Sequence, residues 1–128
     1  MSDAQARGSA PQRKGERYLQ IERRCKDLIV YANIMVKQFP KREKYALAAR
    51  IMELCYDLLT LAITTGKRLH KKTTLTDMNV KHEVLRQLVN VAFELRYIDT
   101  KKHRTISTII DEVGRMMGGW IRTELAGA

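Results

Sequence analysis

Lysine and arginine are the side chains of this sequence best suited to a chemical task, because they gather in short segments free of acidic residues. Residues 67–72 and 100–104 each contain several cations and no aspartate or glutamate. Over the whole chain, 24 lysines and arginines stand against 14 acidic residues, which gives a net charge of +10. Clustered cations neutralise phosphates and release counterions, so they favour a nucleic acid or an acidic protein surface as partner. The residues predicted to supply this contact are Lys67, Arg68, Lys71, Lys72, Arg86, Arg96, Lys101, Lys102 and Arg104.

The motifs that could indicate an enzyme are less specific evidence of function than these cationic clusters. Arg96 and His103, with six residues between them, resemble the R-x(4–6)-H motif of HEPN-type ribonucleases, in which the histidine acts as acid or base and the arginine holds the phosphate. Tyr97 follows the arginine where that family usually has a small polar residue, so a ribonuclease is kept as an alternative. The one His-Glu dipeptide lacks the second histidine of a zinc-binding helix. We therefore predict no enzyme, no catalytic residue, no metal and no cofactor.

The cysteines and the lengths of the apolar segments indicate the cellular compartment in which the protein is expected. Cys25 and Cys55 match no C-x-x-C pattern and fall on or beside apolar stripes, which predicts buried, unreactive thiols in a reducing environment. No run approaches the roughly 20 apolar residues that a bilayer span needs. The first 17 residues contain no apolar stretch typical of a secretory leader. We expect a cytoplasmic protein that does not bind a membrane.

Apolar residues recur with helical spacing in four segments, and no segment alternates with the period of a strand. Pro40 separates the first two segments, Gly66 follows the second, and Thr76 is a candidate N-cap for the third. These signals predict helices over residues 16–39, 41–65 and 76–99 and from residue 105 onward, after a disordered basic arm over residues 1–15. The predicted fold class is all-α, an up-down-up-down antiparallel four-helix bundle over residues 16–126.

This topology decides which connections share an end of the bundle. The first and third connections lie together, so Lys37, Lys41, Arg42 and Lys44 join residues 101–104 at one end. Residues 67–72 lie at the other end with the chain termini.

The second predicted helix has more apolar surface than a single bundle can cover. One stripe supplies the core, and a second stripe runs along the opposite side. The second stripe comprises Tyr45, Met52, Tyr56, Leu59 and Ile63. An exposed apolar row of this size is typical of an interface, so these residues predict a homo-oligomer. In the last helix, three glycines cost about 1 kcal/mol each relative to alanine, which predicts close approach of another helix backbone at Gly114, Gly118 and Gly119.

The run Ile110-Asp-Glu-Val-Gly-Arg-Met-Met-Gly-Gly-Trp-Ile121 resembles the C-terminal signature of the accessory variability determinant (Avd) family of diversity-generating retroelements. Phe39-Pro40-Lys41, Leu75-Thr76-Asp77 and Tyr97-Ile98-Asp99 are similar to landmarks of that family at its helix junctions, and the resemblance covers residues 18 to 125. The family is related to four-helix proteins encoded in intervening sequences of 23S ribosomal RNA genes, so a scaffold protein of such a sequence is a further alternative.

The resemblance implies more than the residue pattern alone. Avd proteins form a ring-like homo-oligomer, a pentameric barrel with a basic surface. They bind the reverse transcriptase of the element and its template RNA, with DNA as a further candidate, and support mutagenic cDNA synthesis and retrohoming. The polymerase does the chemistry, so the resemblance implies a non-catalytic accessory protein.

Overall fold

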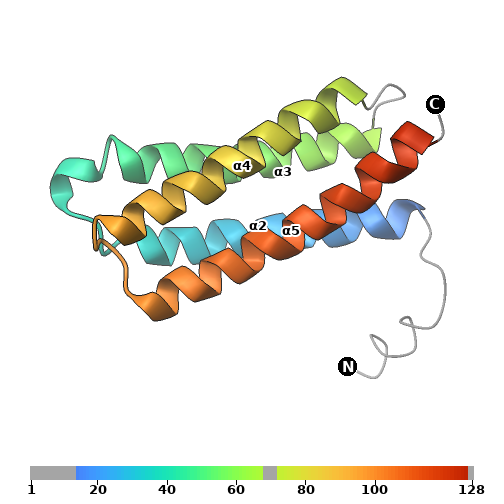
Figure 1. Cartoon of the computed structure of the whole chain (residues 1–128). Coiled ribbons are helices and arrows are strands. Elements are labelled where there is room, and N and C mark those ends of the chain that lie inside the picture. Colours follow the sequence, from blue (N-terminus) through green and yellow to red (C-terminus); the bar gives the residue numbers. More distant parts are fainter. Residues whose placement is uncertain (1–13, 68–71, 127–128) are drawn as a thin grey trace.

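The computed structural model describes residues 14–67 and 72–126, and within these ranges it consists of helices without a strand (Figure 1). The elements are α2 (Lys14–Val36), the short 3₁₀ helix η1 (Lys41–Glu43), α3 (Leu47–Lys67), α4 (Lys72–Glu94) and α5 (Thr100–Ala126). Four long helices in up-and-down order confirm the predicted all-α bundle. None of the described helices is long and apolar enough to cross a membrane.

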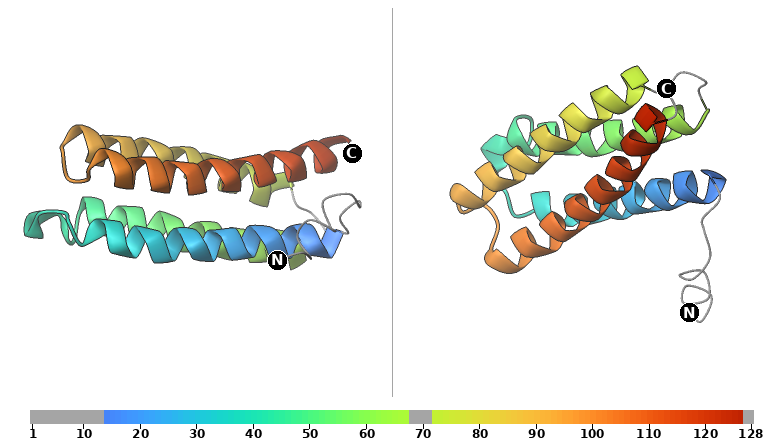
Figure 2. Two further views of the ribbon diagram at one scale, coloured as in Figure 1. Left: turned by 90° about the horizontal axis from the view of Figure 1, so that it is seen from below. Right: turned by 45° about the vertical axis from the view of Figure 1, so that its right-hand side comes forward.

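The four helices form two layers, one of α2 with α3 and one of α4 with α5 (Figure 2). Each helix packs on two neighbours, because α3 also contacts α4 and α2 also contacts α5. The connections α2–α3 and α4–α5 lie at the same end of the bundle, as the antiparallel topology predicts (Figure 1). We call this end, residues 37–46 and 95–104, the loop end.

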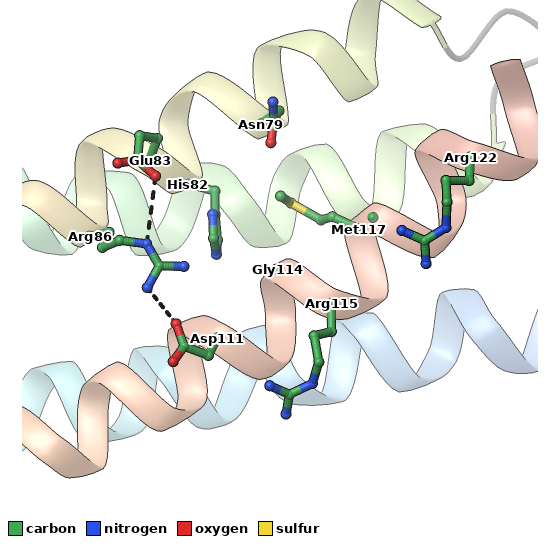
Figure 3. Close-up of a pocket in the computed structure, with 10 residues that line it drawn as sticks. Asn79, His82, Glu83, Arg86, Asp111, Gly114, Arg115, Met117 and Arg122 are labelled. Atoms are coloured by element: carbon green, nitrogen blue, oxygen red, sulfur yellow. Dashed lines mark hydrogen bonds and ion pairs between the residues drawn. The ribbon is translucent and has the colours of Figure 1, made fainter.

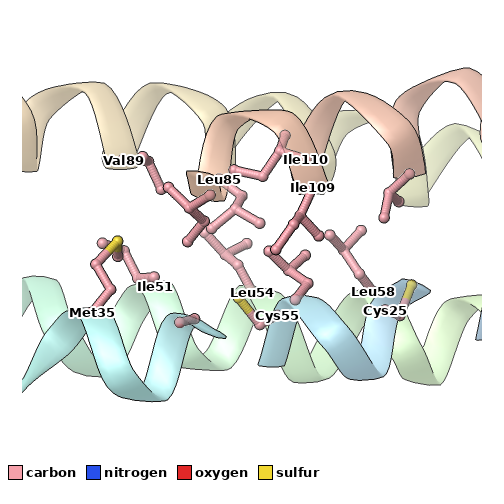
Figure 4. Close-up of a cluster of buried hydrophobic side chains, with 14 of the residues drawn as sticks. Cys25, Met35, Ile51, Leu54, Cys55, Leu58, Leu85, Val89, Ile109 and Ile110 are labelled. Atoms are coloured by element: carbon pink, nitrogen blue, oxygen red, sulfur yellow. The ribbon is translucent and has the colours of Figure 1, made fainter. Parts of the chain in front are cut away.

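The core lies between the two layers and follows the three-four spacing of the apolar residues (Figure 4). Leu54 and Leu58 of α3 and Leu85 of α4 lie between the layers, and all three are fully buried. Cys25 and Cys55 are buried free thiols, as predicted. Burial disfavours the thiolate and raises the pKa of each cysteine to about 12.

The predicted boundaries around Pro40 are wrong. α2 ends at Val36, three residues before Phe39, and single hydrogen-bonded turns carry the chain onward to Phe39. The second long helix begins at Leu47, because residues 41–43 form the 3₁₀ helix η1. Glu43 then accepts the Leu47 N–H with Oε1 at 3.3 Å. Pro40 therefore lies between the first two long helices, as predicted, but α2 ends before Phe39 and the short helix η1 precedes α3.

The boundaries at the other junctions also shift. α3 continues through Gly66 to Lys67, and α4 begins at Lys72. Thr76 is therefore not an N-cap: it lies inside α4, where its hydroxyl donates to the Lys72 carbonyl at 2.9 Å. α4 ends at Glu94, and α5 starts five residues before the predicted Thr105. Asp99 caps α5 by accepting the Lys102 N–H at 2.8 Å. Residues 1–13 of the predicted arm lie outside the described residues, and residues 14 and 15 belong to α2.

Candidate nucleic-acid and protein interface

The loop end brings together cations from two segments that are far apart in the sequence. Residues 37–46 and 95–104 contain eight lysines and arginines and two carboxylates, Glu43 and Asp99. Asp99 is engaged as the cap of α5. Glu43 accepts a hydrogen bond from Leu47 and another from Tyr97. Both acids of the loop end are therefore used within the fold.

Tyr97 joins the two connections of the loop end. Its hydroxyl donates to Glu43 Oε2 at 2.8 Å, and its ring lies 5.3 Å from the ring of Phe39 between centroids. The Arg42 guanidinium approaches the same hydroxyl at 3.4 Å. The hydrogen bond to Glu43 is the main cause of a raised pKa of Tyr97, because it favours the protonated phenol. These contacts hold the cations of both connections on one surface.

None of the eight cations of the loop end forms an ion pair within the described part of the chain. The ion pairs that do occur there lie along the helices. Arg24 pairs with Asp27 and Glu112, and Lys81 pairs with Asp57 at 3.0 Å. Several cations along the helices are thus paired with carboxylates, whereas those of the loop end are not, and a surface of unpaired cations suits a polyanion.

Arg96 has a backbone conformation that is unusual for its type. Its φ is +63°, and it is the one non-glycine residue in this region among those described. Its N–H donates to the Phe93 carbonyl and the Tyr97 N–H donates to the Ala92 carbonyl, both at 2.9 Å. This pair of bonds is the Schellman arrangement that ends a helix, with Arg96 where glycine is usual. The side chain is exposed at the loop end.

His103 is part of the contact between α4 and α5. Its Nε2 lies 2.9 Å from Asn90 Oδ1, and its ring stacks on Phe93 with centroids 4.2 Å apart. No hydrogen bond or ring contact joins His103 to Arg96 among the described residues. The two residues of the ribonuclease motif are thus both at the loop end, with the histidine engaged in packing.

A groove of about 550 Å³ lies between α4 and α5, on the outer side of their layer (Figure 3). Arg86 of α4 extends across it and forms an ion pair with Asp111 of α5, and its Nε lies 3.5 Å from Glu83. The predicted cation Arg86 is therefore held between two carboxylates. The groove carries both signs of charge.

His82 and Gly114 explain how α4 and α5 approach each other at the floor of this groove. Nε2 of His82 lies 2.7 Å from the Ile110 carbonyl oxygen, and the imidazole is buried. A Cβ on Gly114 would lie 2.8 Å from His82 Cε1. The close approach predicted for the glycines is thus made by an imidazole at Gly114, not by a helix backbone. Gly119 has nothing within 4 Å of its Cβ position.

Arg115 and Arg122 also line the groove, and neither was among the cations predicted from the sequence. Both lie on the side of α5 opposite its core stripe, seven residues apart and so on one face of the helix (Figure 3). That spacing is the signal that could have identified them.

The second cationic cluster lies at the end of the bundle opposite the loop end. Lys67 is the last residue of α3 and Lys72 is the first of α4, and both are exposed. Arg68 and Lys71 lie outside the described residues.

The predicted second stripe of α3 is only partly exposed. Tyr56 is 52% exposed, while Met52, Leu59 and Ile63 are half-buried. Tyr45 does not belong to this stripe, because it precedes the first residue of α3. It is 85% exposed at the loop end.

Further exposed apolar residues lie on α2, and they were not predicted from the sequence. Leu19, Val30 and Ile34 are exposed on α2, in the same layer as α3. All three lie opposite the core residues of α2 at helical spacing, so a hydrophobic count of both faces would have found them.

Comparison with known proteins identifies one family. The model of the bAvd-like family matches residues 19–124, which is most of the chain. No curated protein matches the chain.

Proposed function

The chain belongs to the bAvd-like family, and on this premise we propose that it is the non-catalytic accessory subunit of a diversity-generating retroelement. Membership in this family points to an Avd-type accessory protein. In the proposed role the protein binds the reverse transcriptase of the element and its RNA, and so supports mutagenic cDNA synthesis and retrohoming.

The unpaired cations of the loop end are the observation that carries the RNA part of the proposal. Phosphates of RNA would replace solvent as partners of Arg96, Lys101, Lys102 and Arg104 without breaking an ion pair of the fold. Such binding is led by the phosphate backbone, so its affinity falls steeply with salt.

The groove between α4 and α5 is better suited to a protein partner. It presents Glu83 and Asp111 together with Arg86, Arg115 and Arg122, so the two carboxylates offset most of the positive charge that would attract a polyanion. A protein surface can match both signs at once. We therefore assign the reverse transcriptase to this groove.

Assembly into a homo-oligomer, a pentamer in the family that the chain resembles, is assigned to the face around Tyr56. Its half-exposed ring lies in one layer with the exposed Val30 and Ile34 of α2. Tyr56→Glu is expected to reduce the mass in light scattering to that of one chain, while Tyr56→Phe keeps the assembly. A wild-type protein that is itself monomeric would contradict this assignment.

RNA binding is tested by titration at several salt concentrations with a charge-reversal pair. Lys101→Glu with Lys102→Glu is expected to weaken binding at least about tenfold at moderate salt, since a few phosphate contacts carry this much affinity. Acidic residues in the first turn of α5 favour the helix dipole, so the variant should fold.

Arg23→Glu with Lys26→Glu is the matched control, because it makes the same change in net charge on the exposed side of α2. An equal loss in both double variants, or an affinity that ignores salt, would contradict RNA binding at the loop end. Cleavage of the RNA during these titrations that disappears in His103→Ala would contradict the non-catalytic role.

A further inference from the structure

A pocket of about 330 Å³ opens at the loop end, between the end of α2 and the start of α3. Its walls are mainly apolar and include Val36 and Phe39 before Pro40, and Ala48 and Met52 of α3. The ring of Phe39 also packs on the ring of Tyr97, which does not line the pocket. The volume lies at the small end of the range for ligand sites, which suits a flat group of one ring system.

Three lysines stand around this apolar pocket. Lys37, Lys41 and Lys44 all line it, and none of them forms an ion pair within the described residues. An apolar interior with cations around it selects a ligand that is flat and apolar in one part and negatively charged in another.

Tyr45 provides a second aromatic surface beside the pocket. It is 85% exposed, and Nζ of Lys44 lies 5.5 Å from the centroid of its ring. Lys44 also lines the pocket, so the ring and the pocket share one cation. An exposed tyrosine among lysines is typical of surfaces on which the bases of single strands stack.

We infer that the loop end binds unpaired nucleotides of RNA: one base enters the pocket, a neighbouring base stacks on Tyr45, and the lysines bind the phosphates between them. This inference rests on the proposed function and adds the form of RNA that is recognised. Bases of a duplex are stacked inside the helix and cannot enter the pocket, whereas unpaired bases can be splayed outward. An acidic peptide would use the lysines but has no need of the exposed Tyr45 ring.

The experiment compares a single-stranded RNA with a duplex of the same length, each carrying the fluorescent base 2-aminopurine. Tyr45→Ala is expected to weaken the single strand about tenfold, the loss typical of one stacked base, and to leave the duplex unchanged. Tyr45→Phe keeps the ring and should restore both the affinity and the quenching of the fluorescent base. Ala49→Leu fills the pocket from α3 without changing charge and should weaken the single strand alone.

The outcomes separate this inference from the function on which it rests. If neither RNA binds, the proposed function fails together with the inference. If both RNAs bind equally and neither Tyr45→Ala nor Ala49→Leu discriminates between them, the inference is overturned while RNA binding stands. An acidic peptide that displaces the single strand from wild type but not from Ala49→Leu would also overturn it, because the pocket would then belong to a protein partner.

Discussion

Replacing Arg96 by glycine is expected to stabilise the fold and to weaken RNA binding at the same time. Arg96 holds a φ of +63° after the last turn of α4. A residue with a Cβ is about 1–2 kcal/mol less stable in this left-handed region than in the right-handed one, and glycine has no such penalty. The greater freedom of glycine in the unfolded chain offsets roughly 0.5–1 kcal/mol of the gain. The net expectation is a fold more stable by about 0.5–1 kcal/mol.

The assay is thermal unfolding followed by circular dichroism at one fixed protein concentration, because assembly makes the midpoint depend on concentration. For a domain of this size the midpoint should rise by roughly 2–5 °C. Arg96→Ala is the matched control, since it removes the same charge but keeps the Cβ, and its midpoint should not rise. Both variants lose one cation, so both should lose the same RNA affinity, and the slope of log affinity against log salt should fall by about one.

Two results would refute this reasoning separately. A glycine variant no more stable than the alanine variant would show that the backbone at Arg96 is not strained. Different RNA affinities for the two variants would show that the binding depends on the local backbone and not on the charge.

Two further predictions concern the bundle itself. In urea unfolding, Gly114→Ala is expected to lower the free energy of unfolding by about 1–3 kcal/mol, because its Cβ would lie 2.8 Å from the imidazole of His82 on α4. Gly119→Ala has nothing within 4 Å of its Cβ and should raise the free energy of unfolding by about 0.5–1 kcal/mol. The opposite order of the two variants would contradict the packing described. Cys25 and Cys55 should react with a thiol reagent at pH 8 only as the protein unfolds, since burial raises both pKa values to about 12. A thiol in the unfolded chain has a pKa near 9.0, so the stability that each buried thiol contributes is complete below that pH. Between this pH and about 12 the free energy of unfolding should fall by up to about 1.4 kcal/mol per pH unit for each thiol. Denaturation curves over this pH range, compared with those of the double alanine variant, measure the loss.

The sequence was sufficient for the helical class and for the sharing of ends by the connections, because both depend on repeated spacing over long segments. The sequence did not predict at which residues the individual helices begin and end. The turn after α4 ends in a left-handed residue, which is usually signalled by glycine, and here the position is occupied by Arg96. Gly66, which does carry that signal, lies within α3. At both places the presence or absence of glycine therefore fails to predict where the helix ends.

The candidate site could be predicted only in part, because it depends on contacts between distant segments of the chain. Clusters of cations can be counted in a sequence, but whether a cation is paired depends on the neighbouring helix. Arg86 is held by Asp111 across the groove, 25 positions along the chain, and no local pattern reveals that pairing. Tyr45 was placed on a helix face by spacing alone, and the 3₁₀ helix η1 moves it to the loop end.

The hydrogen bond between His82 and the Ile110 carbonyl also sets how far α5 is shifted lengthwise against α4. Leucine and isoleucine contacts tolerate such sliding, because one apolar side chain can replace another at little cost. The buried imidazole of His82 does not tolerate sliding, because it must reach the carbonyl of Ile110. It also needs the space opposite Gly114, where a Cβ would lie too close to the ring. The alignment fixed in mid-bundle thereby sets where α5 begins relative to the end of α4, and with it the spacing of the cations on the connection between them.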